Sequence, residues 1–283
     1  MSRRKKEIKF MYEYGLSFEE ILNLGYFYFD VIQQLYYLYT ETGDSFYKEE
    51  YLKHCWCESF DDSSYLIIGD THMGSKSERK DYLDQALNAA KERNIKTVLH
   101  GGDLGDGMID PSSKYNQLHK QISHMIEDFP KIDDMDYYIA TGNHDKKYRQ
   151  QGYNFEDTLE KKREDIHIVG KNIGFVKVHS HLISLEHGTT NLAYYSNWHP
   201  TPEMRFIAHE HRLSIKKQIT MIPALCQNDV ADFKDIGKPY RPGYLILNIE
   251  PMTNYDIFGV EGYQFVKDKA VKVKERSFYL KKK

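Results

Sequence analysis

Apolar positions in the first 60 residues of the chain recur at helical spacing. Ser17 and Glu20 have the spacing of a capping box, which predicts a helix that opens directly after Ser17. Gly25 interrupts this pattern, and a second apolar face follows over residues 26–39. We therefore expect residues 1–60 to form a helical extension that contains a helix, a glycine turn and a second helix.

This outline is typical of two different functions. One is a DNA-binding helix-turn-helix, and the other is a plain helical hairpin that caps a domain, mediates self-association or binds a protein partner. Recognition helices usually present Arg, Lys, Asn or Gln to the bases. The second helix offers Gln33 and Gln34 but has no basic residue between positions 26 and 39. Both interpretations of residues 1–60 stay open.

From residue 65 onward, short apolar runs alternate with helical stretches. Strands and helices are expected in alternation over residues 65–68, 79–93, 96–99, 115–128, 137–140 and 155–164. This alternation predicts parallel strands with helices packed on the faces of the sheet. Later strands follow one another directly, over residues 175–178, 182–185, 206–208, 219–223 and 244–249. The pattern predicts an α/β fold in which these later strands form a second sheet.

Each of the first three strands runs directly into a cluster of polar residues. The clusters are Asp70-Thr71-His72, Gly101-Gly102-Asp103 and Gly142-Asn143-His144-Asp145. Two further clusters, Glu186-His187-Gly188 and His209-Glu210-His211, follow later strands. Because ligands of open α/β sheets collect at the carboxyl ends of the strands, we expect the clusters to converge on one crevice. Asp, Asn and His are ligand types, so the ordered set predicts a metal site.

Charge narrows the classes of function. The chain has 39 Lys and Arg against 42 Asp and Glu, and a net charge of −3 excludes a binder whose whole surface is basic. Residues 267–283 hold eight basic and two acidic residues, a net of +6 that leaves −9 on the other 266 residues. This basic C-terminal tail is interpreted either as a solvated tail or edge strand, or as a strip that contacts a phosphate backbone.

The three cysteines, Cys55, Cys57 and Cys226, are too few for a disulfide framework and fit a reducing compartment. None of them lies in a ligand cluster, which argues against a site for a soft metal. The most apolar stretch, residues 24–39, is too short and too polar to span a bilayer. The N-terminus lacks the apolar core of a signal peptide. We therefore expect a cytoplasmic protein with no membrane partner.

Taken in order, the motifs resemble those of the calcineurin-like metallophosphoesterase superfamily. They are Asp70-x-His72, Gly102-Asp103, Gly142-Asn143-His144-Asp145, His187-Gly188 and His209-x-His211, and the resemblance covers roughly residues 64–250. It implies a four-layer sandwich, with two packed mixed sheets flanked by helices, in a domain over residues 61–266. The chain departs from the pattern at Ala208, where the family has Gly, and residues 1–60 lie outside the family core.

The resemblance also implies a ligand set for two divalent cations. One cation would be held by Asp70, His72 and His211, and the other by Asn143, His187 and His209. Asp103 would bridge the two. Oxygen and nitrogen ligands without a thiol suit Mn²⁺, with Fe or Zn²⁺ as alternatives. Such a pair of cations would activate a bridging hydroxide as the nucleophile.

By the same resemblance, His144 would stabilise the transferred phosphoryl group or protonate the leaving oxygen. Asp145 would orient the other ring nitrogen of His144. Both residues are therefore candidate catalytic residues, and both are distinct from the implied ligands.

The implied reaction is hydrolysis of a phosphate ester, and the substrate is expected to be a phosphodiester in nucleic acid. Asp70-Thr71-His72-Met73-Gly74 resembles the first motif of DNA-repair exonucleases of this superfamily. The basic tail and 23 tyrosines offer backbone contacts and stacking surfaces. The alternatives are a phosphomonoesterase for a protein or small molecule, and a non-catalytic DNA-binding or scaffolding protein. The complete ligand set argues against the last of these.

Overall fold

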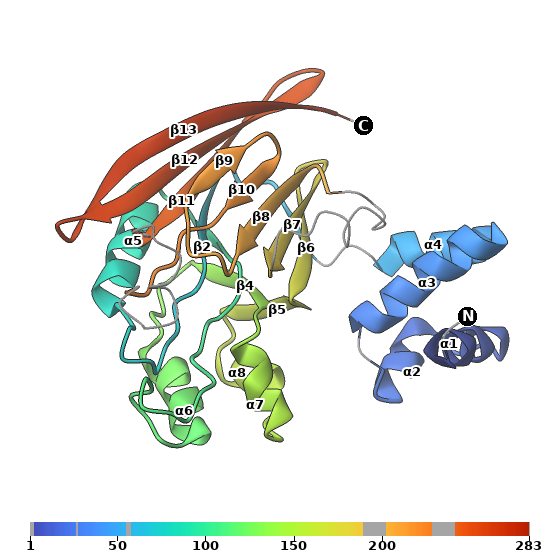
Figure 1. The fold of residues 1–283 in the computed structure, drawn as a ribbon. Coiled ribbons are helices and arrows are strands. Elements are labelled where there is room, and N and C mark those ends of the chain that lie inside the picture. The colour runs from blue at the N-terminus through green and yellow to red at the C-terminus, as the bar shows by residue number, and fades with distance from the viewer. Residues whose placement is uncertain (1–2, 27, 55–57, 189–201, 228–240, 283) are drawn as a thin grey trace. The chain divides into compact units, whose positions relative to one another are not determined.

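The computed structural model describes residues 3–26, 28–54, 58–188, 202–227 and 241–282. The chain divides into two units, Met1–Glu58 and Ser59–Lys283. Figure 1 shows that the first unit is helical and that the second is built around a large sheet.

Four helices make up the described part of the first unit: α1 (Arg3–Glu13), α2 (Phe18–Asn23), α3 (Tyr28–Thr42) and α4 (Ser45–His54). The predicted capping box is confirmed at the start of α2. The backbone N–H of Glu20 donates to Ser17 Oγ at 3.3 Å, and the N–H of Ser17 donates to the Glu20 carboxylate at 2.7 Å. Gly25 has a φ of 90°, a conformation that L-residues rarely adopt, so the turn between α2 and α3 depends on glycine.

The helices of the first unit enclose an apolar core of their own. Its buried members are Ile8, Tyr12, Phe18, Ile21, Val31, Ile32, Leu35, Leu38 and Tyr47. The apolar face expected on the second helix is the face that α3 buries, because residues three and four positions apart lie on one side of a helix. Among the described residues, no helix is both long enough and apolar enough to cross a membrane.

The second unit contains the strands of one mixed sheet. They are β1 (Glu58–Phe60), β2 (Ser64–Ile68), β3 (Thr97–His100), β4 (Asp136–Thr141), β5 (Ile166–Lys171), β6 (Ile173–Val178), β7 (His181–His187), β8 (Met204–Ala208), β9 (Ser214–Lys216), β10 (Ile219–Met221), β11 (Gly243–Pro251), β12 (Tyr255–Val266) and β13 (Lys269–Lys281). Their order is β13-β12-β11-β2-β3-β4-β5-β6-β7-β8-β10-β9, and β1 pairs with β6. Strands β2 to β5 are parallel, as the alternation of strands and helices predicts.

Helices cover one face of the parallel strands. They are α5 (Lys80–Glu92), α6 (Leu118–Asp128), α7 (Asp145–Gln150) and α8 (Phe155–Lys162). A continuous apolar core joins strand residues such as Leu66 and Ile139 to helix residues such as Leu83, Ile122 and Tyr148. The side chains of a strand alternate between its two faces, so the remaining buried residues of these strands point away from the helices.

Strands β6 to β10 turn back to cover that second face. The strand expected at residues 244–249 is not part of this half, because β11 pairs antiparallel with β2 and extends the first half. Ala208 ends β8 and lies against Gly101, which directly follows β3. A Cβ added at Gly101 would be only 2.9 Å from the Cβ of Ala208. The halves of the sheet are joined by the β5–β6 hairpin, whose pairing is limited to Gly170 with Gly174 and Lys171 with Ile173. Ala208, the departure from the family pattern, is thus accommodated by a glycine opposite it.

The predicted α/β class, with packed mixed sheets flanked by helices, is confirmed. The two sheets are halves of a single hydrogen-bonded sheet, because the β5–β6 hairpin links them. Within residues 58–188, 202–227 and 241–282, every helix precedes β5 and packs on the first half. A fourth, helical layer over the second half is therefore not formed by these residues.

The basic segment at the C-terminus forms an edge strand. Strand β13 pairs with β12 along most of its length and has no neighbour on its other side in the described sheet (Figure 1). Residues 271–277 are all exposed, and only Phe278 and Leu280 of β13 are buried. The structure thus agrees with the edge-strand alternative among the interpretations of the basic tail.

A buried polar cluster also connects the two halves of the sheet. His181 on β7 contacts the Glu203 carboxylate through Nδ1 at 2.6 Å and the Asp256 carboxylate on β12 through Nε2 at 3.1 Å. His181 and Asp256 are both fully buried, and Lys282 Nζ lies 3.1 Å from the other Asp256 oxygen. We call His181, Glu203, Asp256 and Lys282 the inter-half cluster.

Replacing His181 with Leu leaves the buried Asp256 carboxylate without its imidazole partner. Removing one partner of a buried charged pair costs about 3–5 kcal/mol. We expect hydrogen exchange of the β7 and β12 amides to accelerate by about 100-fold or more. The double variant His181→Leu/Asp256→Leu should recover part of the lost protection, because it removes the fully buried Asp256 carboxylate. Unchanged exchange in the single variant would contradict the role given to this cluster.

Candidate metal centre

The polar clusters predicted at the strand ends meet in the structure. Asp70 and His72 follow β2, Asp103 follows β3, and Asn143 and His144 follow β4, with Asp145 opening α7. His187 ends β7, and His209 and His211 follow β8. The first group comes from one half of the sheet and the three later histidines come from the other half. Folding the second half over the first therefore assembles the site.

Asp103 lies at the middle of this assembly. Its Oδ2 is 3.1 Å from His187 Nε2 and 3.7 Å from His72 Nε2. Its Oδ1 accepts a hydrogen bond from the backbone N–H of His144 at 2.8 Å. His187 Nε2 also lies 3.0 Å from Asn143 Oδ1. Asp103 is thus within reach of residues from both implied triads.

Asp70 connects the remaining histidines. His211 Nε2 lies 3.2 Å from Asp70 Oδ1, and the backbone N–H of His209 donates to Asp70 Oδ2 at 3.1 Å. The rings of His72 and His211 are 5.5 Å apart, and those of His187 and His209 are 5.1 Å apart. All seven implied ligands are therefore linked by short contacts within one site.

Three groups of these side chains place their ligand atoms within 4.8 Å of one another. They are His72 with His211 and Cys226, His72 with Asp103 and His144, and Asp103 with His187 and His209. One buried atom in the site, His72 Nε2, has no hydrogen-bond partner among the described residues. Buried polar atoms are normally paired, so this nitrogen fits a role as a ligand to a cation. The donor set of imidazole and carboxylate suits a divalent transition-metal ion.

The carboxylates of the site are buried, and the imidazoles balance their charge. Burial raises the pKa of Asp70, but the charge of His211 outweighs this effect and lowers it to about 2. Burial likewise raises the pKa of Asp103, and His187 outweighs it and holds that pKa below the usual range. Both carboxylates are therefore ionised at neutral pH and available to a cation.

The histidines divide into two kinds. Burial lowers the pKa of His72 to about 3, so its ring is neutral and offers a lone pair. Burial also lowers the pKa of His187, but the nearby Asp103 carboxylate raises it to about 9. The pKa of His211 is raised well above its ordinary value, because the Asp70 carboxylate outweighs the effect of burial. A cation that takes these two imidazoles as ligands must displace their protons.

The backbone of the site is strained. Five of the seven implied ligands have left-handed backbone conformations: Asp70 (φ 50°), His72 (φ 43°), Asp103 (φ 53°), His209 (φ 81°) and His211 (φ 50°). Residues other than glycine adopt such conformations rarely, at a cost of about 1–3 kcal/mol each, and they cluster at functional sites. The turns after β2, β3 and β8 thus aim side chains at the site at the expense of local stability.

Asp145 does not orient His144, so that sequence-based expectation is wrong. The Asp145 carboxylate is fully buried and accepts hydrogen bonds from three backbone N–H groups, those of Leu104 (3.2 Å), Gly105 (2.9 Å) and Gly142 (2.8 Å). Burial raises its pKa, with a further contribution from Asp103. Asp145 instead ties the loop after β3 to the turn after β4.

His144 is oriented by Asp106. Its Nδ1 lies 2.5 Å from the backbone carbonyl oxygen of Asp106. A carbonyl oxygen can only accept a hydrogen bond, so Nδ1 carries the proton and donates it. Because the contact is made by the backbone of Asp106, the type of residue at that position gives no signal of it in the sequence.

Cys226 also enters the site, contrary to the expectation that no cysteine would. Its side chain is buried, and its Sγ lies 4.0 Å from His211 Nδ1. Cys226 follows β10 in a segment without a motif, so the sequence gives no sign of this contact. Cys55 and Cys57 lie outside the described residues.

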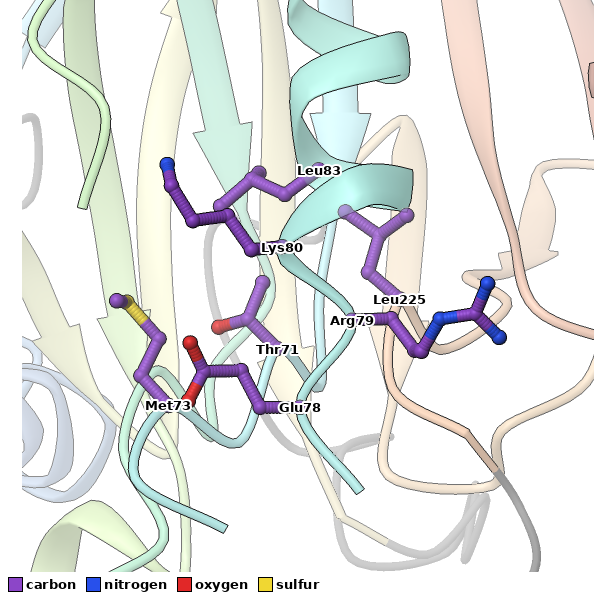
Figure 2. Close-up of a pocket in the computed structure, with 7 residues that line it drawn as sticks. All are labelled: Thr71, Met73, Glu78, Arg79, Lys80, Leu83 and Leu225. Atoms are coloured by element: carbon purple, nitrogen blue, oxygen red, sulfur yellow. The ribbon is translucent and has the colours of Figure 1, made fainter. Parts of the chain in front are cut away.

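A small pocket beside the site involves the loop that carries His72 (Figure 2). It is lined by Thr71, Met73, Glu78, Arg79, Lys80, Leu83 and Leu225. Its charged side chains are paired: Glu78 accepts from Lys114 Nζ at 2.9 Å, Arg79 donates to Asp81 and Asp268, and Lys80 donates to Asp84. These pairs anchor the loop rather than present charge to a substrate.

The family model described as calcineurin-like phosphoesterase matches residues 63–235, a range that includes every strand-end cluster. No curated protein matches the chain in sequence.

Solved structures with a similar fold include three from different organisms. Vacuolar protein sorting 29 from Cryptosporidium parvum is 16% identical, with 77% of this chain and 98% of that chain covered and a TM-score of 0.47. Wild-type Vps29 from Entamoeba histolytica, complexed with Zn²⁺, is 14% identical, with 76% and 98% covered and a TM-score of 0.42. The calcineurin-like phosphoesterase YfkN from Bacillus subtilis is 9% identical, with 77% and 90% covered and a TM-score of 0.36.

Gly102 provides a test of the geometry around His187. It has a φ of 105°, and a Cβ added there would lie 2.6 Å from His187 Nδ1. We expect Gly102→Ala to displace the imidazole and to weaken metal binding by about 10–100-fold, the range seen when support of a ligand is lost. Equilibrium dialysis with Mn²⁺ or Zn²⁺ measures this.

Gly259→Ala in β12 is the matched control, because its added Cβ would meet only Asn248 atoms at 3.8–3.9 Å. Wild-type affinity in both variants would show that the close approach at Gly102 does not position His187.

Proposed function

Because the chain belongs to the calcineurin-like phosphoesterase family, we propose that it is a phosphodiesterase that uses two divalent cations to hydrolyse phosphodiester bonds in nucleic acid. The observation that carries the proposal is the convergence of a complete oxygen and nitrogen ligand set in which His72 Nε2 is buried without a hydrogen-bond partner. A decayed site would lack part of this set.

The proposed ligands fall into two triads around a shared carboxylate. One cation would be held by Asp70, His72 and His211, and the other by Asn143, His187 and His209. Asp103 would serve both, in keeping with its short distances to His72 and His187. Mn²⁺ is the proposed metal, with Fe or Zn²⁺ as alternatives. When bound, the cations supply Lewis-acid polarisation of the phosphate and a water of lowered pKa.

His144 is the proposed general acid. Its Nδ1–H is committed to the Asp106 carbonyl, so Nε2 is the nitrogen left to give a proton to the leaving oxygen. The His144 side chain is 25% exposed, whereas that of Asp103 is 2% exposed, so His144 is accessible to a substrate. Asp145 supports the site indirectly, by holding the backbone that follows Asp103 and the backbone that precedes Asn143.

The basic edge strand supports nucleic acid as the substrate class. Lys274 and Arg276 lie on the same face of β13 as the buried Phe278, yet both are exposed. Among the described residues, neither has an acidic partner at ion-pair distance. The turn between β12 and β13 carries Asp268, which forms an ion pair with Arg79 at 3.0 Å. Arg79 ends the loop that follows His72, so this ion pair connects the turn to the loop of the site. An extended polyanion contacts such a strip, whereas a small monoester does not need it.

A panel of substrates tests the proposed reaction. With Mn²⁺ we expect turnover of a chromogenic phosphodiester and of single- or double-stranded DNA, and slower turnover of a chromogenic monoester. His144→Ala should reduce diester turnover by about 10²–10⁴-fold, the usual contribution of a positioned general acid.

The metal content of the His144→Ala variant is the control, and elemental analysis should find it unchanged. Turnover of the monoester alone would favour a phosphatase instead. If the variant loses its metal, His144 is a ligand rather than the general acid. The structure also permits that assignment, because the ligand atoms of His144, His72 and Asp103 lie within 4.8 Å of one another.

Charge reversal on β13 tests the substrate class. We expect Lys274→Glu/Arg276→Glu to weaken DNA binding and to lower the slope of log affinity against log salt by about 2, one for each lost phosphate contact. Hydrolysis of the small chromogenic diester should stay at the wild-type rate. Fluorescence anisotropy with labelled DNA over a salt series measures the slope.

Lys161→Glu/Lys162→Glu, at the exposed end of α8, makes the same change of charge on another surface and serves as the control. Equal loss of DNA binding in the two double variants would mean that binding depends on the net charge of the protein and that β13 does not contact the DNA specifically.

A further inference from the structure

The peptide unit between Gly101 and Gly102, directly after β3, makes a hydrogen bond at each of its ends. Its carbonyl oxygen, Gly101 O, lies 3.0 Å from His187 Nδ1 and can only accept, so Nδ1 carries the proton. Its N–H group, on Gly102, donates to His100 Nδ1 at 3.0 Å. His187 therefore keeps Nε2 free of a proton for a cation, and the peptide that fixes this choice is held by His100.

The other nitrogen of His100 is directed at the loop of the first ligands. Because Nδ1 accepts a hydrogen bond, Nε2 carries the proton of the neutral ring, and it lies 3.2 Å from Thr71 Oγ1. The Thr71 hydroxyl accepts this bond and donates its own proton to Leu104 O at 3.0 Å. Thr71 stands between Asp70 and His72, two of the residues proposed to hold one cation.

The environment of His100 fits it for these bonds. His100 is 0% exposed and Thr71 is 3% exposed, so bulk water does not compete for either side chain. Burial lowers the pKa of His100 to about 4, and the ring is neutral near neutral pH with one donor and one acceptor. An apolar side chain could fill the same space at the end of β3, but it would offer the Gly102 N–H no acceptor.

We propose that His100 is a positioning residue that links the two metal positions. Through Thr71 it fixes the loop of Asp70 and His72, and through the peptide after β3 it fixes the ring nitrogen that His187 offers. The inference rests on the metal centre proposed above and goes beyond it, because His100 is not itself a proposed ligand.

Titration with Mn²⁺, followed by electron paramagnetic resonance, tests this role without an activity assay. Two Mn²⁺ ions that share a carboxylate are exchange-coupled, and their spectrum differs from that of a single bound ion. Thr71→Val keeps the shape of the side chain and removes its hydroxyl. We expect it to weaken the position of Asp70 and His72 by about 10–100-fold. The variant should then carry a single ion at Mn²⁺ concentrations that give the coupled spectrum in the wild-type protein.

Two further variants separate positioning from packing. Thr71→Ser keeps the hydroxyl and should restore the coupled spectrum. In His100→Asn, the amide oxygen replaces Nδ1 as the acceptor for Gly102 N–H, but the shorter side chain does not reach Thr71. We expect His100→Asn to match Thr71→Val. The double variant should lose no more affinity than Thr71→Val alone, because both changes remove the same hydrogen bond.

Thr97→Val is the matched control, because it makes the same substitution at the opposite end of β3. It removes the hydrogen bond that Thr97 Oγ1 donates to Asp62 Oδ2 at 2.6 Å. We expect a lower unfolding temperature and an unchanged Mn²⁺ spectrum. Equal loss of the coupled spectrum in Thr97→Val would mean that general destabilisation weakens the site, and the inference would be wrong.

The remaining outcomes distinguish this inference from the proposed function. If Thr71→Val and His100→Asn both show the coupled spectrum at wild-type Mn²⁺ concentrations, the metal centre stands and His100 only packs. If the wild-type protein never shows that spectrum at saturating Mn²⁺, the proposed pair of cations fails, and this inference fails with it. Should Thr71→Val not fold, His100→Asn carries the same test.

Discussion

The burial of two carboxylates, Asp70 and Asp103, is the constraint on which the rest of the molecule depends. Both are almost completely removed from solvent, and a buried charge is tolerated only beside an opposite charge or a metal. His211 lies beside Asp70 and His187 beside Asp103, and both histidines belong to the second half of the sheet. The sheet must therefore fold over on itself for the first half to be stable. The left-handed turns at the ligands are a local cost of that arrangement.

Much of the fold could be predicted from the sequence, because local patterns determine it. The runs at 65–68, 96–99 and 137–140 are apolar and bounded by polar clusters, and each became a strand of the parallel sheet. What the sequence did not predict depends on long-range pairing. For residues 267–283 an edge strand was one of several alternatives, because β13 carries basic residues on both faces, and only its pairing with β12 decides between them. The linkage of the two halves through the short β5–β6 hairpin is likewise a matter of tertiary geometry.

The site, like the fold, has a part that local sequence patterns predict and a part that depends on tertiary packing. The convergence of Asp70, Asp103 and Asn143 was predictable because parallel strands end at a common edge. The contacts that each side chain makes could not be predicted in this way. Asp145 opens α7 and turns inward to backbone N–H groups, so adjacency in the sequence misidentified the partner of His144. Cys226 reaches the site through packing of an irregular segment, for which no periodicity or motif exists.

The division of the ligands between the halves of the sheet has a thermodynamic consequence. A cation that binds residues before β5 together with residues after β6 binds only when the halves are closed. Its binding free energy is then coupled to closure, and metal at 100 times its dissociation constant adds about 2.7 kcal/mol to the stability of the closed form. Metal availability in the surroundings thereby becomes a determinant of how long the chain persists folded, independently of any reaction that the centre performs.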